Sequence, residues 1–169
     1  MKNHIHIQDN FFDSKFIQTL QKELITLEFK HRFSTFKHIN NYDHNYHHVE
    51  LTEDAPVVQE VTKQLKTHFN FSSIKYMQSS YLLSFPNTPA VPHQDESDFN
   101  CLIYLLGNPL INNGTGFYIE QEGNQVLNSH VGFKENRAIF FDAKIYHSPL
   151  QFAGNSTPRY VMANFIKTK

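Results

Sequence analysis

Val91-Pro-His-Gln-Asp95 stands shortly before the apolar run Cys101-Leu-Ile-Tyr-Leu-Leu106, which has the composition of a buried strand. Residues two apart in an extended segment project from the same face, so His93 and Asp95 can offer an imidazole nitrogen and a carboxylate oxygen to one metal ion. The chain holds 11 His, so a His-x-Asp triplet is a weak signal by itself. It needs support from elsewhere in the sequence.

That support comes from the C-terminal half. A second strand-like run, Arg137-Ala-Ile-Phe-Phe-Asp142, leads into Tyr146-His147-Ser148, and Arg159 follows 12 residues after His147. Two His and one carboxylate form a facial triad that binds Fe(II) and leaves open positions. His93, Asp95 and His147 are therefore the predicted metal ligands. Arg159 is the predicted anchor for an anionic cosubstrate, because a guanidinium binds a carboxylate through two parallel hydrogen bonds.

The order of these landmarks resembles that of the Fe(II)- and 2-oxoglutarate-dependent dioxygenases, and most closely their small prolyl-hydroxylase-like branch. The resemblance covers about residues 74–167, and Asp9-Asn-Phe-Phe-Asp-Ser14 also resembles the approach to the first helix in that group. The landmarks are His93-x-Asp95, Leu102-Ile-Tyr-Leu105, Gly114-Thr-Gly-Phe-Tyr118, Asn136-Arg-Ala-Ile-Phe-Phe-Asp142, His147 and Pro158-Arg-Tyr160.

The resemblance implies Fe(II), 2-oxoglutarate and O2 as cofactor and cosubstrates, with ascorbate as a reductant. The implied reaction hydroxylates a peptidyl residue such as proline, a free amino acid or another small metabolite, and releases succinate and CO2. Arg159 would bind the distal carboxylate of 2-oxoglutarate, with Tyr104 and Tyr81 as candidate further donors; the alternative for either Tyr is a core ring. Two positions depart from the pattern. Val161 stands where many members carry Ser or Thr, and Phe85 stands where some carry Tyr.

Two other functions stay open. One is a cupin-like metalloenzyme that binds a metal through the same residues without 2-oxoglutarate, although Arg159 argues against it. The other is a noncatalytic jelly-roll binding module, since one fold hosts unrelated functions. Iron-dependent formation of succinate separates the dioxygenase from both.

Composition narrows the class. The 169 residues favour one domain, and a net charge of −1 without a basic block argues against nucleic-acid and membrane partners. The expected partner is a small-molecule or peptide substrate. The one cysteine, Cys101, lies in an apolar run and is expected to be an inert core thiol. No apolar run has the length of a transmembrane helix and the N-terminus lacks a secretory pattern, so a cytoplasmic protein is expected.

Helices precede strands along the chain, which predicts an α+β fold. Apolar periodicity predicts helices from Asp13 or Ser14 to about Glu28 and from about Pro56 to Phe69, with a short strand at 4–8 whose Ile5 and Ile7 face inward. Alternation and turn residues predict strands at about 74–85, 99–106, 115–120, 125–132, 137–142 and 159–166. We expect helical support over about 1–72, packed on one sheet of a jelly roll (double-stranded β-helix) over about 73–167.

Residues 31–52 are polar, aromatic and rich in His. A connection of this length in a compact domain is often functional, so a lid over the metal pocket is one interpretation. A second metal site is another, because His48-Val49-Glu50 repeats the spacing of a ligand pair. A solvated loop with a hairpin is the third.

Overall fold

The computed structural model describes residues 4–36, 42–85, 91–110, 113–150 and 157–169. It contains two helices, α1 (Ser14–Leu24) and α2 (Pro56–Phe69). The larger antiparallel sheet contains β1 (Ile5–Asp9), β2 (Lys30–Phe36), β3 (Tyr42–Leu51), β4 (Ile74–Ser84), β5 (Phe99–Leu106), β8 (Arg137–Asp142) and β10 (Arg159–Thr168). The smaller sheet contains β6 (Gly114–Gln121), β7 (Asn124–Gly132) and β9 (Tyr146–Leu150).

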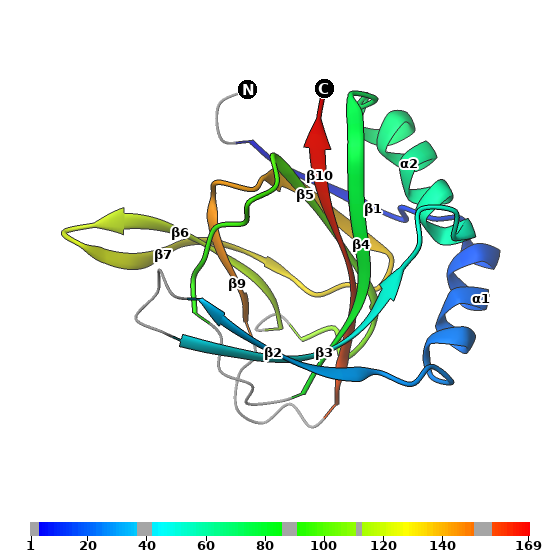
Figure 1. Cartoon of the computed structure of the whole chain (residues 1–169), viewed down its shortest axis with the longest axis horizontal. Helices are drawn as coiled ribbons and strands as arrows, with labels where there is room; N and C mark the ends of the chain where they lie inside the picture. Colours follow the sequence, from blue (N-terminus) through cyan, green and yellow to red (C-terminus); the bar gives the residue numbers. More distant parts are fainter. Residues whose placement is uncertain (1–3, 37–41, 86–90, 111–112, 151–156) are drawn as a thin grey trace.

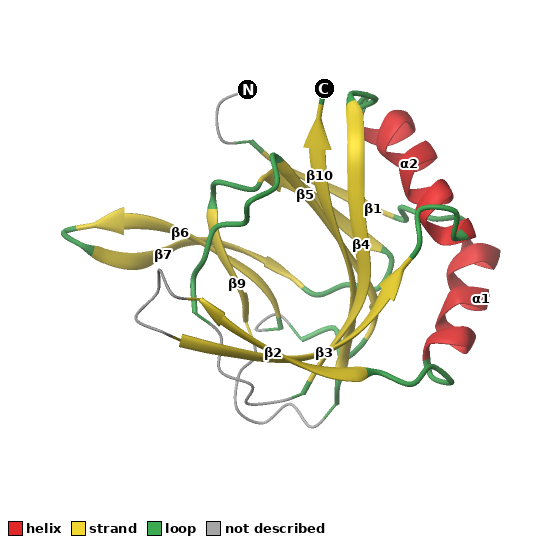
Figure 2. Ribbon diagram, in the orientation of Figure 1, coloured by secondary structure: helices red, strands yellow, loops and turns green. Residues whose placement is uncertain are grey.

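The two sheets form a jelly roll whose larger sheet carries both helices on its outer face (Figures 1 and 2). The strand orders are β1-β8-β5-β10-β4-β3-β2 and β7-β6-β9, and every named pairing is antiparallel. The predicted α+β jelly roll with two N-terminal helices on one sheet is therefore confirmed.

Each helix begins where the sequence indicated, but α1 ends early. The Asp13 carboxylate accepts hydrogen bonds from the backbone N–H groups of Lys15 (3.0 Å) and Phe16 (2.9 Å), which caps the helix. Helix α1 stops at Leu24, not near Glu28, and Leu27 is 38% exposed. Helix α2 spans the predicted residues and ends at Phe69, and the following residue, Asn70, has a left-handed φ of 51°.

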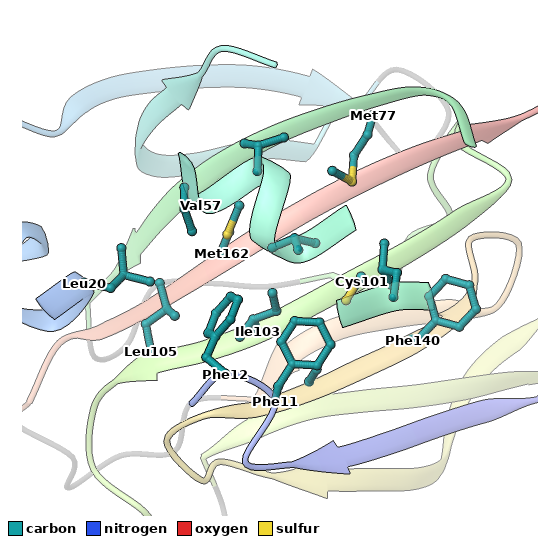
Figure 3. Close-up of a cluster of buried hydrophobic side chains, with 14 of the residues drawn as sticks. Phe11, Phe12, Leu20, Val57, Met77, Cys101, Ile103, Leu105, Phe140 and Met162 are labelled. Atoms are coloured by element: carbon teal, nitrogen blue, oxygen red, sulfur yellow. The ribbon is translucent and has the colours of Figure 1, made fainter. Parts of the chain in front are cut away.

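The main hydrophobic core lies between the helices and the outer face of the larger sheet (Figure 3). Phe11 and Phe12 enter it just before α1, and the rings of these two residues meet edge to face. Burial of this much apolar surface is the main source of stability in a domain of this size. Other members drawn in Figure 3 are Leu20, Val57, Met77, Cys101, Ile103, Leu105, Phe140 and Met162.

A second, smaller cluster fills part of the space between the two sheets. It joins Tyr104, Ile139 and Phe141 of the larger sheet to Phe117 and Val131 of the smaller one. The rest of that space is a cavity, described below. The main apolar core therefore lies on the helix side of the larger sheet, and the cavity lies on its other side, between the two sheets.

The N-terminal region contains more strand than predicted. Strand β1 was expected, and a hairpin within 31–52 was one of three interpretations of that segment, but β2 and β3 were not predicted to join the larger sheet, to which all three strands belong. The division into helical support over 1–72 and a sheet core after it is thus too simple. Polar and aromatic residues hide β2 and β3 in the sequence, because β2 is an edge strand and one face of β3 borders the cavity.

The prediction that Ile5 and Ile7 both face inward is half right. Ile5 packs against the cluster between the sheets, whereas Ile7 is 50% exposed. On the opposite face of β1 the His6 ring lies against Phe69 and Phe140. Strand β1 is an edge strand, so only part of either face is covered.

Cys101 lies in the core with no exposed surface, and burial raises the pKa of its thiol, as expected for an inert core thiol. No helix in the described part of the chain has both the length and the apolar composition to cross a membrane.

Strand β1 is held to β8 by an ion pair as well as by the sheet. Asp9 accepts from Arg137 through both carboxylate oxygens, at 2.6 and 3.1 Å, and from the Lys134 ammonium at 2.7 Å. The hydrogen bond from Arg137 is the main reason that the pKa of Asp9 falls from 3.8 to about 2. A carboxyl whose pKa is lowered by folding stabilises the folded state above its unfolded pKa and loses that contribution as pH falls toward the folded pKa.

We predict that Asp9→Asn lowers the free energy of unfolding at pH 7 by about 1 kcal/mol or less, since solvent screens this partly exposed pair. The difference from wild type should shrink between pH 4 and about 2, where Asp9 itself is protonated. Urea unfolding of both proteins across this pH range measures it. A difference that does not change with pH would contradict the assignment.

Candidate metal centre

The three predicted ligands are brought together by a backbone bridge. His93 N donates to the His147 carbonyl at 3.0 Å, and His147 N donates to the His93 carbonyl at 2.9 Å. The Asp95 N–H donates to the Ala143 carbonyl at 3.1 Å, so the segment that carries the triplet lies along the chain that enters β9. The two imidazole rings consequently lie with centroids 4.7 Å apart.

The ligand atoms of the three side chains converge. One atom from each of His93, Asp95 and His147 lies within 4.8 Å of the others. His147 Nε2 is 3.2 Å from Asp95 Oδ2, and His93 Nε2 is 3.9 Å from Asp95 Oδ1. Cis ligands of an ion with bonds near 2.1 Å lie about 3 Å apart, so this spacing suits a divalent first-row metal.

Both imidazoles are oriented in the same way. His93 Nδ1 lies 2.9 Å from the Val91 carbonyl, and His147 Nδ1 lies 2.9 Å from the Ile145 carbonyl. A carbonyl only accepts, so each Nδ1 carries a proton, and Nε2 is the ring atom that faces Asp95 and that a metal would bind in its deprotonated form. A lone pair that faces a carboxylate oxygen requires a cation between them, either a proton or a metal ion.

The Asp95 carboxylate is held ionised. Burial opposes ionisation, but the hydrogen bond and charge of His147, the charge of His93 and the amide of Asn100 outweigh it, and the pKa of Asp95 lies below its usual value. An ionised carboxylate beside two Nε2 lone pairs is the donor set that Fe(II) takes in a facial triad.

A cavity of about 210 Å³ connects the three ligands to Arg159. Its walls come from both sheets, and the polar side chains lie mostly on β3 and β4. Besides the triad and Arg159, the lining residues are Tyr46, His48, Gln78, Ser80, Leu82, Ser84, Leu102, Thr115, Pro149, Val161, Ala163 and Phe165.

Arg159 is the first residue of β10 and is only 4% exposed. Its Nη1 donates to the Gly114 carbonyl at 2.6 Å, while its buried Nε has no hydrogen-bond partner in the part of the chain that the structure describes. Burial lowers the pKa of this guanidinium, and Tyr104 opposes the shift. Among the described residues no carboxylate forms an ion pair with Arg159, although a buried charge is costly unless it is paired.

Strand β6 brings further polar groups to the Arg159 end of the cavity. A Cβ at position 114 would lie 2.1 Å from the Val131 carbonyl, so only glycine fits there. This close approach of β6 to β7 places the Gly114 carbonyl against Arg159 and the adjacent Thr115 in the cavity wall. Thr115 therefore provides a hydroxyl that Val161, also in the wall, cannot.

The two predicted tyrosines lie in different places. Tyr104 is fully buried, and its hydroxyl donates to Thr115 Oγ1 at 2.8 Å and to the Val131 carbonyl at 3.2 Å. Burial raises the pKa of Tyr104 to about 12. Tyr104 thus supports a wall residue and does not itself line the cavity. Tyr81 belongs to the core under the helices, where burial and then Glu23 raise its pKa, and the structure does not bring it to the cavity.

The His-rich segment 31–52 forms most of the hairpin β2–β3, and part of it reaches the cavity. Tyr46 and His48 lie in the wall, as the lid interpretation requires, but on a strand of the sheet. His48 Nε2 lies 3.7 Å from Glu50. The triad is the one group of three candidate ligands among the described residues, so no second metal site is found there.

Sequence reasoning missed several residues of the site. Strand β9 was not predicted because it contains Pro149, which an edge strand tolerates. Thr115 lies within the landmark Gly114-Thr-Gly-Phe-Tyr118 but was given no role, and Ser80 belongs to no motif. Asn100 did give a signal, since it is a polar residue within the apolar run of β5 and is fully buried.

Comparison with known proteins agrees at the level of the fold. No family model matches the sequence, and no curated protein matches it. Similar solved structures include a 2OG-Fe(II) oxygenase-family oxidoreductase from Burkholderia pseudomallei (TM-score 0.68, 10% identity, covering 96% of this chain and 84% of that one). A prolyl-4-hydroxylase from Pseudomonas putida has a TM-score of 0.66 and 10% identity, covering 99% and 94%. HygX from Streptomyces hygroscopicus, with nickel and 2-oxoglutarate bound, has a TM-score of 0.68 and 10% identity, covering 98% and 84%.

The chain thus has the fold of the 2OG-Fe(II) oxygenases, as the sequence motifs indicated. Its residues also fit the two groups that this fold class implies. The triad offers two Nε2 atoms and a carboxylate to a metal, and the buried guanidinium of Arg159, which pairs with no carboxylate of the described residues, lines the same cavity.

We predict that the protein binds one divalent ion per chain and that His147→Ala or Asp95→Ala each weaken binding more than the about 10- to 100-fold typical of a supporting residue. Calorimetric titration with Mn(II) measures this without turnover. His130→Ala, on exposed β7, is the control and should bind as wild type does. Unchanged affinity in either ligand variant, with the fold intact by circular dichroism, would remove that ligand from the assignment.

Proposed function

We propose that this protein is an Fe(II)- and 2-oxoglutarate-dependent dioxygenase that hydroxylates its substrate and releases succinate and CO2. The observation that carries the proposal is the buried guanidinium of Arg159, which lines the same cavity as the triad and forms no ion pair with a carboxylate of the described residues. A metalloenzyme that does not use an anionic cosubstrate gains nothing from burying such a charge, since the desolvation cost is several kcal/mol for an unpaired ion.

Each part of the site has a separate task. His93, Asp95 and His147 would hold Fe(II), which with bound 2-oxoglutarate and O2 supplies the oxidising power for hydroxylation. Arg159 binds the distal carboxylate, and the Thr115 hydroxyl adds a donor or acceptor beside it. The apolar wall residues Leu102, Val161 and Phe165 exclude water from the reacting groups.

The remaining wall favours an uncharged reacting group. Gln78, Ser80 and Tyr46 offer neutral hydrogen-bonding groups, and no Lys, Asp or Glu lies in the described lining apart from Asp95. The charges of Fe(II), Asp95, Arg159 and a 2-oxoglutarate dianion cancel, so a further buried charge would be unpaired and costly. A residue within a peptide, such as proline, or a neutral metabolite fits this balance better than a charged group at the metal.

The proposal is tested by measuring succinate formed from 2-oxoglutarate with Fe(II) and ascorbate, alone and with candidate substrates. Proline-containing peptides, free amino acids and neutral metabolites form the first panel. Metal binding without succinate would favour the cupin-like metalloenzyme, and failure to bind either metal or 2-oxoglutarate would favour a noncatalytic binding module.

We predict that Arg159→Met, which keeps an unbranched stem but removes the guanidinium and its charge, raises the 2-oxoglutarate concentration required by about 10²- to 10³-fold. Loss of one partner of a buried pair costs about 3–5 kcal/mol, and each 1.4 kcal/mol corresponds to about tenfold. Arg159→Lys keeps the charge and should lose less. Mn(II) affinity should persist in both, and an unchanged 2-oxoglutarate requirement in Arg159→Met would overturn the proposed cosubstrate.

We also predict that Ser80→Leu separates substrate binding from cosubstrate binding. Ser80 pairs with Ala163 across β4 and β10, and both small residues line the cavity. A larger side chain costs about 1–3 kcal/mol of crowding, so substrate-stimulated succinate release should fall about tenfold or more. Metal affinity and substrate-independent release should change little. An equal loss of substrate-independent succinate release would show that Ser80 borders the 2-oxoglutarate site and not the substrate site.

A further inference from the structure

Asn100 interrupts the apolar sequence of β5, has no exposed surface and touches a predicted metal ligand. Its Nδ2 donates to Asp95 Oδ2 at 2.6 Å. This is the same carboxylate oxygen that lies 3.2 Å from His147 Nε2. Burying an amide costs free energy unless its groups are hydrogen-bonded, so the placement of Asn100 needs a reason.

A second buried residue fixes the orientation of the Asn100 amide. The Ser97 hydroxyl donates to Asn100 Oδ1 at 2.6 Å, and Ser97 is also buried. The NH2 group of Asn100 meets the carboxylate oxygen of Asp95, so the amide oxygen is left to accept from the Ser97 hydroxyl. The hydrogen bonds therefore run in one direction, from Ser97 to Asn100 and from Asn100 to Asp95.

The contact acts on the terminal torsion of the Asp95 side chain, which turns the carboxylate. The terminal torsion of an Asp side chain is broad and roughly two-fold, so an unsupported carboxylate samples many orientations. The backbone hydrogen bonds of this segment fix the position of the Asp95 main chain. Asn100 then fixes the plane of the Asp95 carboxylate relative to the His147 ring. A ligand ordered during folding loses less conformational entropy when the metal binds.

We propose that Asn100, oriented by Ser97, is a positioning residue that sets the affinity and coordination geometry of the metal centre through Asp95. The inference rests on the proposed metal site, and metal binding by the wild-type protein tests that site separately.

The chain contains a matched control for this arrangement. On the helix side of the same sheet, Ser79 Oγ donates to Asn164 Oδ1 at 2.8 Å, and Asn164 Nδ2 donates to the Cys101 carbonyl at 2.9 Å. Asn164 is as fully buried as Asn100, and Ser79 as fully as Ser97 or more so. The two Ser–Asn pairs differ in that one ends on a candidate metal ligand and the other on a backbone carbonyl.

The experiment compares Asn100→Leu and Ser97→Ala with Asn164→Leu and Ser79→Ala in the full chain. Mn(II) affinity is measured by calorimetry, and the visible absorption of bound Co(II) reports coordination geometry. Asn100→Leu should weaken Mn(II) binding about 10- to 100-fold and alter the Co(II) bands, as loss of a residue that orients a ligand typically does. Ser97→Ala should produce a smaller change in the same direction, because Asn100 remains. Asn164→Leu and Ser79→Ala should lower thermal stability but leave both metal readouts as in wild type.

Wild-type affinity and Co(II) bands in a folded Asn100→Leu would overturn the inference. Equal weakening in Asn100→Leu and Asn164→Leu would also overturn it, since general destabilisation would then explain the effect. If Asn100→Leu does not fold, Ser97→Ala against Ser79→Ala decides by the same readouts. A wild-type protein that binds no metal would instead refute the metal site itself.

Discussion

The two hydrogen bonds between the backbones of His93 and His147 are the interaction on which the candidate metal centre depends. The segment that carries His93 and Asp95 belongs to neither sheet beyond this isolated bridge. The bridge joins residues 54 positions apart and places their side chains on one side. Each ring is then turned by the carbonyl two residues before it, from Val91 or Ile145. One local arrangement, used twice, thus sets both the position and the tautomer of the two histidines.

Such a site is held against an energetic cost that the rest of the fold must offset. Arg159 is buried without an anion among the described residues, and Asp95 is ionised in a largely buried place. Neither buried charge stabilises the folded state by itself. The apolar core that offsets this cost lies on the opposite face of the same sheet, between it and α1 and α2. Successive side chains of β4 and β10 point to opposite faces of the sheet, so one face packs in the core and the other borders the cavity. Tyr81 and Met162 lie in the core, whereas Ser80 and Ala163 line the cavity.

The parts that could be predicted from the sequence are those with local signals. Helices α1 and α2 have apolar periodicity and a cap or an N-terminal Pro, and the strands of the core have apolar runs bounded by turns. The triad and Arg159 could be placed because motif order implied which strand ends meet. Strand β9 was not predicted, and β2 and β3 were predicted only as one of three interpretations of 31–52, because edge position and cavity-facing side chains remove apolar alternation. Tyr81 was misleading for a related reason, since a shift of one residue in a strand exchanges the cavity for the core.

The same reasoning explains how the fold is shared with structures at 10% identity while no family model matches the sequence. Sheet pairing requires alternation and suitable turns, which many sequences satisfy, and the proposed chemistry requires only a few side chains that reach one cavity. Those side chains need not stay on one strand. Val161 brings no hydroxyl to the Arg159 end, but Thr115, on the facing sheet, does, and the buried Tyr104 hydroxyl supports it from behind. An equivalent polar group can therefore come from either of two strands that face the same cavity, because binding depends on where the oxygen lies and not on which strand carries it.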